Sequence, residues 1–140
     1  MPAKDIFHDT VRQALVNDDW TVTHEPYWIK LSDSDIHIYV DLAAERLIAA
    51  EKDNQKIAVE IKSFVGNSWM TDFHQALGQF LDYRVALREK EPERQLFLAI
   101  PLDIYNAFFS RRFIQTVCAE YQVRLLVFDP SRAEIYAWIK

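Results

Sequence analysis

The run Lys56-Ile57-Ala58-Val59-Glu60-Ile61-Lys62 predicts the strand around which the fold is arranged. Side chains in a strand alternate between its two faces, so Val59 and Ile61 share one face. Glu60 and Lys62 then share the other face. The run therefore predicts a strand whose end presents a carboxylate beside an amine.

A second alternating run, 36–42, contains another carboxylate, Asp41. Two carboxylates and an amine at strand ends are the groups that a magnesium-dependent phosphodiesterase uses, because Mg²⁺ prefers carboxylate oxygens, waters and phosphate oxygens. On this interpretation Asp41 and Glu60 are metal ligands, and the backbone carbonyl of Ile61 is a further one. Lys62 would orient the attacking water and stabilise the anionic transition state.

Composition predicts a single globular domain, 1–140, because half of the residues are hydrophobic and 14% are aromatic. No apolar run reaches the ~20 residues that a membrane span needs, and no signal peptide is recognisable. A lone cysteine, Cys118, fits a reducing compartment. We therefore expect a cytoplasmic protein with no membrane contact.

The charge and the glycine content exclude or disfavour several function classes. A formal net charge of −5 weighs against a protein that coats nucleic acid nonspecifically, but it does not exclude a DNA enzyme with a cation-filled carboxylate site. Only two glycines, Gly66 and Gly78, are present, which excludes a P-loop and a GxGxxG loop. Scattered histidines and the absence of cysteine pairs disfavour structural zinc.

The order of periodic segments predicts an α/β fold with a central mixed β-sheet flanked by α-helices. Asp5 is the expected N-cap of the first helix. We expect helices near 5–17, 70–88 and 103–121, and strands near 21–24, 27–31, 36–42, 47–50, 57–63, 96–100, 123–128 and 134–139. A polar hairpin connection at 52–55 is expected between two of these strands.

Two polar residues of the helix expected at 70–88 complete the candidate site. Gln79 and Tyr83 are four residues apart, so they lie on the same face of the helix. Both side chains can hydrogen-bond a phosphate or an active-site carboxylate. We therefore add Gln79 and Tyr83 to the candidate catalytic residues.

In that order, Asp41, Glu60-x-Lys62 and Gln79-xxx-Tyr83 resemble the PD-(D/E)xK nuclease superfamily, in particular its branch with a QxxxY motif. The proline that precedes the aspartate in that superfamily is Val40 here. The resemblance implies a restriction-endonuclease-like core and a Mg²⁺ or Mn²⁺ cofactor. It also implies an acidic residue on the first helix, for which Asp9 and the neighbouring His8 are both open candidates.

Longer stretches of the chain resemble the cyanobacterial XisH family of fdxN element excision controlling factors. The matching text includes 41–45 (DLAAE), 47–52 (LIAAEK), 57–64 (IAVEIKSF) and 76–80 (ALGQF). The resemblance implies DNA as a partner, together with a site-specific recombinase and an XisI-like protein. It implies a role in removing a DNA element during cell differentiation.

Each part of this site also has an ordinary structural interpretation. Glu60 and Lys62 alone are more often a solvent-facing charged pair, and Gln79 and Tyr83 are ordinary helix residues. Asp41 could end a strand at a turn. The basic run Arg84, Arg88, Lys90 and Arg94 is interpreted as a solvated helix face, with a phosphate-tracking edge as the alternative.

Three functions remain open from the sequence. The first is metal-dependent DNA cleavage, and the second is a catalytically inactive DNA- or protein-binding accessory of the recombinase. The third is one half of a toxin–antitoxin or defence pair. A homodimer through the edge strand expected at 134–139 is possible.

Overall fold

A six-stranded mixed sheet forms the centre of the molecule. The computed structural model describes residues 6–25, 27, 29 and 47–140. Within this part the strands lie side by side in chain order: β1 (Thr21–His24), β2 (Leu47–Lys52), β3 (Gln55–Ile61), β4 (Arg94–Pro101), β5 (Leu125–Asp129) and β6 (Glu134–Ile139). The pairs β3–β4 and β4–β5 are parallel, and the other neighbouring pairs are antiparallel. The predicted α/β fold with a mixed sheet is confirmed.

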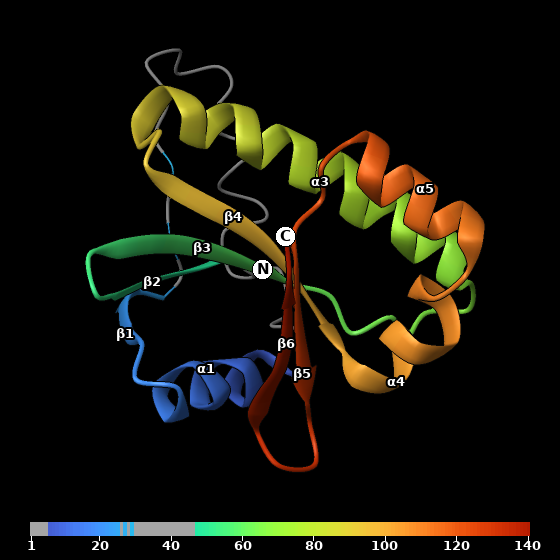
Figure 1. The fold of residues 1–140 in the computed structure, drawn as a ribbon, viewed down its shortest axis with the longest axis horizontal. Coiled ribbons are helices and arrows are strands. Elements are labelled where there is room, and N and C mark those ends of the chain that lie inside the picture. The colour runs from blue at the N-terminus through green and yellow to red at the C-terminus, as the bar shows by residue number, and fades with distance from the viewer. Residues whose placement is uncertain (1–5, 26, 28, 30–46) are drawn as a thin grey trace.

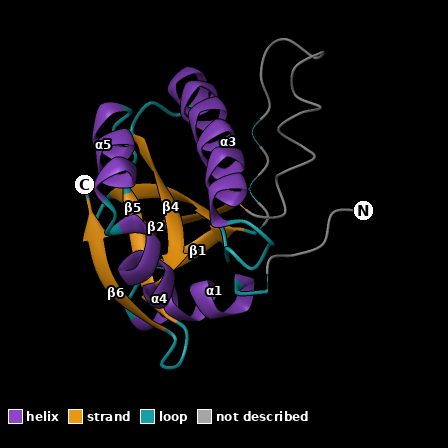
Figure 2. Cartoon of the chain, turned by 90° about the vertical axis from the view of Figure 1, so that its right-hand side faces the viewer, coloured by secondary structure: helices purple, strands orange, loops and turns teal. Residues whose placement is uncertain are grey.

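Helices cover both faces of this sheet (Figure 1). Helix α1 (His8–Asn17) lies on one side, and α3 (Trp69–Lys90) and α5 (Arg112–Glu120) lie on the other. A short helix, α4 (Leu102–Ile104), and a π-helical turn (Tyr105–Phe109) connect β4 to α5. Figure 2 shows the same arrangement from the side, with α1 separated from α3 and α5 by the strands.

Alternation along β3 creates two separate apolar layers. Ala58 packs in the layer that contains the inner face of α3, with Phe73 and Phe80. Val59 and Ile61 pack in the other layer, with residues of α1. Because successive side chains alternate, Glu60 belongs to the same face as Ala58, the face that α3 covers.

Local sequence signals set the ends of the central elements. Asp53 and Asn54 connect β2 to β3 with φ values of 49° and 66°, as a two-residue type I′ hairpin requires. At the start of α3 the Ser68 hydroxyl accepts a hydrogen bond from the Thr71 amide at 3.2 Å, which caps the helix. Helix α3 stops at Lys90, shortly before Pro92.

The expectations for the N-terminal part need correction where the structure describes it. Helix α1 begins at His8, and the N-cap residue is Phe7, which makes no side-chain cap hydrogen bond. Asp5, the expected cap, lies outside the described residues. Tyr27 and Ile29 are not in a strand. The other residues of 27–31 lie outside the described part. The whole of the strand expected at 36–42 lies outside it as well.

The single helix predicted for 103–121 is wrong, because the chain breaks it at Ser110 and Arg111. Arg111 is extended, with φ −68° and ψ 138°, and α5 starts after it. The preceding π-helical turn lets two consecutive aromatic residues, Phe108 and Phe109, both enter the core, at 3% and 2% exposure. The Ser110 hydroxyl donates to the Asn106 carbonyl at 2.6 Å and satisfies the end of this turn. Packing of the two rings therefore overrides the helical periodicity.

Two further expectations concern membrane spanning and the edge of the sheet. No helix among the described residues is both long enough and apolar enough to cross a membrane. Strand β6 pairs only with β5 among the described strands, so it forms one edge of that sheet. Pairing of this edge with a second copy stays a prediction.

Candidate functional site

Glu60 and Lys62 lie at the carboxyl end of β3, in the middle of the sheet. Glu60 is aligned with Leu47 of β2 and with Leu98 of β4. The Lys62 amide donates to the Ala99 carbonyl at 3.0 Å, which extends the ladder by one residue and places Lys62 on the Glu60 face. Glu60 is 0% exposed and Lys62 is 7% exposed. The interpretation of these two residues as a solvent-facing pair is wrong.

The inner face of α3 supplies the other predicted polar groups. Tyr83 is 2% exposed and packs in the α3-side layer together with Ala76 and Phe80. Gln79 lies one turn before Tyr83 on the same face. Its amide oxygen, Oε1, is buried and accepts no hydrogen bond from any residue that the structure describes. The fold thus places Gln79 and Tyr83 on the helix face that covers the Glu60 side of the sheet.

Of the other two predicted metal ligands, Ile61 lies within the described part of the structure and Asp41 does not. The side chain of Ile61 is wholly buried in the opposite layer, so only its backbone carbonyl is available to a metal on the Glu60 side. Asp41 lies outside the described residues. Its role as a ligand beside Glu60 stays a prediction.

The donor atoms on the α3-side face suit a hard divalent cation. The set contains the carboxylate of Glu60 and the buried amide oxygen of Gln79. Both are oxygen donors of the kind that Mg²⁺ and Mn²⁺ accept. A buried carboxylate is costly unless an opposite charge compensates it, and a divalent cation supplies such a charge. The chemistry of these two oxygen donors therefore suits the predicted metal, whose binding stays a prediction.

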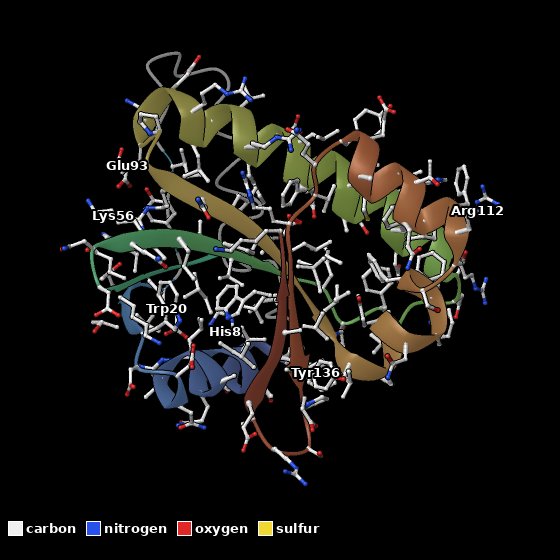
Figure 3. The ribbon with its side chains drawn as sticks, viewed as in Figure 1. His8, Trp20, Lys56, Glu93, Arg112 and Tyr136 are labelled. Atoms are coloured by element: carbon white, nitrogen blue, oxygen red, sulfur yellow. The ribbon has the colours of Figure 1, made fainter. Side chains whose placement is uncertain are left out.

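His8 and Asp9, the two first-helix candidates, gather around a residue that the sequence analysis missed. His8 Nε2 lies 2.6 Å from Glu25 Oε1, and Arg12 Nε donates to Glu25 Oε2 at 2.7 Å. Ligand atoms of His8, Asp9 and Glu25 all lie within 4.8 Å of one another. Figure 3 labels His8 at the start of α1. Among the described residues this is the one group of three potential metal-ligating side chains, and Glu60 is not in it.

Electrostatics at Glu25 favour its charged form. Partial burial opposes ionisation, but the hydrogen bonds from His8 and Arg12 outweigh it, so the pKa of Glu25 is lowered. His8 itself is 2% exposed. The interaction ties α1 to the residue that follows β1. A lone glutamate before a proline carries no sequence signal for such a role.

A groove lies at the carboxyl ends of the three parallel strands, β3, β4 and β5. Its lining comes from Ser63, Pro101 and Asp129, which follow β3 or end β4 and β5, and from Phe7 and Trp69. Open α/β sheets commonly bind ligands at this edge. Ser63, which lines the groove, directly follows Lys62 in the chain, so the groove lies next to the strand end that carries the candidate site.

The turn that leaves this edge is conformationally unusual. Phe64, two residues after Lys62, has φ 58°, a left-handed conformation that non-glycine residues rarely adopt. Its ring packs against Phe108 and Phe109 at centroid distances of 6.1 and 5.4 Å. Such strain is retained only where the surrounding packing holds it. The aromatic contacts supply that packing beside the candidate site.

Comparison of the chain with models of known protein families identifies its family. The family model described as "XisH protein" matches residues 1–136. The chain belongs to the XisH family. A solved XisH family protein from Nostoc punctiforme is 42% identical, with a TM-score of 0.87 over 97% of this chain and 100% of the other.

A second solved structure, an fdxN element excision controlling factor protein from Anabaena variabilis, is also 42% identical to this XisH-family chain. Its TM-score is 0.85, over 98% of this chain and 100% of the other. Comparison with curated proteins finds no match. The resemblance to the XisH family inferred from the sequence is confirmed.

Proposed function

We propose that this XisH-family protein takes part in the excision of a DNA element and that it hydrolyses phosphodiester bonds with a divalent metal. The name of the Anabaena relative, an excision controlling factor, supports the first part. One observation carries the second part. Glu60 is completely buried beside Lys62 at a strand end, on the face covered by the helix that carries Gln79 and Tyr83.

The roles of the residues follow from their chemistry. When bound, Mg²⁺ or Mn²⁺ would neutralise the scissile phosphate and lower the pKa of a coordinated water. Glu60, Asp41 and the Ile61 carbonyl would hold the ion. Lys62 would orient the attacking water and stabilise the charge that develops on the phosphate. Gln79 and Tyr83 would hydrogen-bond a phosphate oxygen or fix the Glu60 carboxylate.

Metal binding and cleavage by matched variants test this proposal. Titration of Mn²⁺ or Mg²⁺ into the whole chain by calorimetry should give binding that disappears in Glu60→Gln. Binding should persist in Glu93→Gln, because Glu93 is 57% exposed and pairs with Lys56 away from the site. Nicking of supercoiled DNA should require both Glu60 and Lys62, with Lys62→Met as the second inactive variant.

Circular dichroism and thermal melting would establish that each variant is folded. Absence of metal binding by the folded native chain would overturn the metal-dependent mechanism. Nicking that survives both Glu60→Gln and Lys62→Met would overturn the assignment of the site.

A catalytically inactive accessory is the second candidate, and the acidic net charge favours it. The formal net charge of −5 opposes independent capture of DNA, so delivery to DNA by a partner would be needed. The expected partners are a site-specific recombinase and an XisI-like protein. For an accessory, association with either partner should be unaffected by Glu60→Gln, whereas loss of association in that variant would exclude this role.

A further inference from the structure

Three arginines from two segments lie together where α3 meets the turn between α5 and β5. Arg84 Nη1 donates to the carbonyls of Tyr121 and Gln122, at 2.6 and 3.1 Å. This places the Arg84 guanidinium at the turn between α5 and β5. Arg88 follows one helical turn later on α3, and Arg124 follows the turn in the chain. The turn thus brings Arg124 to the arginines of α3.

The cluster carries positive charge that no carboxylate of the described residues neutralises. Arg84, Arg88 and Arg124 take part in none of the ion pairs found in this part of the chain. Burial lowers the pKa of Arg84, and the charges of Arg88 and Arg124 lower it further. Because the whole chain is acidic, this concentration of arginine is a local reversal of its charge.

Exposed apolar side chains lie on α3, on α5 and in the turn that follows α5. Val85 on α3 is 54% exposed, Phe113 on α5 is 63% exposed and Tyr121 at the end of α5 is 47% exposed. Phe113, Val117 and Tyr121 recur at four-residue spacing, so they form a stripe along α5. Within α5 itself, Ile114 is the single buried residue. A large part of α5 is therefore open to solvent.

Arg84 gives this surface a fixed centre. Besides its two hydrogen bonds, its guanidinium lies over the Phe80 ring, 5.6 Å from the centroid. A guanidinium held in this way loses little further freedom on binding, which lowers the entropic cost of an interaction. Arg88 is exposed and Arg124 is partly exposed, so both can reach a ligand.

We propose that this α3–α5 surface, defined by Arg84, Val85, Arg88, Phe113, Tyr121 and Arg124, binds a segment of a partner protein that carries carboxylates next to apolar side chains. The three arginines call for carboxylates by charge complementarity. The aromatic and aliphatic side chains call for apolar partners, and arginine beside aromatic residues is the composition enriched in protein interfaces.

A nucleic acid fits this surface less well than a protein does. DNA interfaces are more polar and much more basic than protein interfaces, whereas this surface also exposes Val85, Phe113 and Tyr121. The inference does not depend on the proposed metal site, because none of the six residues belongs to that site. A catalytically inactive chain would bind the partner equally well.

Selection from a random displayed-peptide library on the immobilised whole chain tests the proposal. Enriched peptides should combine Asp or Glu with Leu, Phe or Trp. A labelled synthetic version should lose about tenfold in affinity to Arg88→Glu, and again to Arg124→Glu, by fluorescence anisotropy. Arg132→Glu is the matched control, because Arg132 is an exposed arginine between β5 and β6.

A second pair of variants tests the apolar part of the surface. Tyr121→Ser should weaken the peptide, whereas Tyr136→Ser should not, although Tyr136 on β6 is also exposed, at 62%. Enriched peptides without carboxylates, no enrichment at all, or equal binding by Arg88→Glu would overturn the proposal. Preferential binding of a labelled DNA duplex through Arg88 and Arg124 would also overturn it, in favour of a nucleic-acid surface.

Discussion

Arg94 shows how a single buried cation joins three segments. Its side chain is 2% exposed, and its guanidinium donates to the Ile57 carbonyl at 2.9 Å and to the Glu91 carboxylate at 3.1 and 3.3 Å. It also lies over the Tyr27 ring, 5.0 Å from the centroid. The Tyr27 hydroxyl in turn donates to Glu91. Arg94 therefore connects the end of α3 to β3 and to the segment before β2.

We predict that Arg94→Met lowers the free energy of unfolding by about 3 kcal/mol, because it leaves Glu91 and a strand carbonyl without their buried partner. Lys56→Met is the matched control. Its ammonium lies 3.8 Å from a Glu93 carboxylate oxygen, and both side chains are exposed. Figure 3 labels the two residues. Exposed pairs of this kind contribute at most about 1 kcal/mol. Urea denaturation measures both variants. Equal losses would show that Arg94 contributes no more than a surface charge.

For single residues, the sequence pattern predicts the chemical type of a candidate residue better than it predicts the element or the burial of that residue. The interpretation of Arg94 as part of a solvated helix face with Arg84 and Arg88 is wrong, because Arg94 belongs to β4. The run around Glu60 alternates in a way that suits an exposed or a buried carboxylate equally well. In the folded chain Glu60 is completely buried on the face of the sheet that α3 covers, and the alternating pattern alone does not indicate which face is covered.

The end of α5 shows how a whole element is terminated without glycine or proline. Gln122 has φ 52°, the Gln122 amide donates to Ala119 O, and the Val123 amide donates to Cys118 O. This is the hydrogen-bond pattern of a helix C-terminus with a left-handed residue at C′, a position where glycine is favoured. The turn positions Arg124 and directs the chain into β5.

We predict that Gln122→Gly stabilises the protein by about 0.5–1 kcal/mol, since glycine adopts a positive φ without the strain of a Cβ atom. The same substitution at Gln115, an exposed position inside α5, should destabilise it by about 1 kcal/mol. Thermal melting of the two variants measures this difference. A loss of stability at Gln122 would contradict the left-handed cap.

The element order is largely predictable from the sequence, and the failure of the helix expected over 103–121 has a physical cause. Strand patterns of alternating or continuous apolar residues predict β1 to β6, and the polar connection at 52–55 is confirmed as a hairpin. The helix expected over 103–121 fails because periodicity registers apolar spacing and not the break at Arg111. Packing of Phe108 and Phe109 against distant residues decides that break.

At the scale of the whole molecule, two glutamates tie the helical layers to the rest of the chain. Glu25 accepts hydrogen bonds from His8 and Arg12 on the α1 side. Glu91 accepts them from Arg94 and Tyr27 on the α3 side. At Glu91, as at Glu25, partial burial raises the pKa, but the hydrogen bonds and nearby cations outweigh it, so both pKa values are lowered.

The free energy of unfolding should therefore fall in acid, because Glu25 on the α1 side and Glu91 on the α3 side both become protonated. A carboxyl group whose folded pKa lies below its unfolded value binds protons more weakly in the native state. The two glutamates thus contribute their full stabilisation above the unfolded pKa of 4.5, and they lose it as the pH falls from 4.5 through their folded values. Between neutral pH and about 5 the contribution of these two glutamates should change little.

We predict that the double variant Glu25→Gln, Glu91→Gln is less stable than the native chain at about pH 7 and loses less stability on acidification below the unfolded pKa of 4.5. The glutamine side chains cannot take up the protons that destabilise the native carboxylates. Urea denaturation at a series of pH values measures both slopes, with the exposed Glu89→Gln as a control on α3. If the double variant and the native chain lost stability in parallel in this acid range, other carboxyl groups would govern acid unfolding. Because Glu25 and Glu91 lie on opposite sides of the sheet, each single variant should remove part of the effect, and their contributions should add.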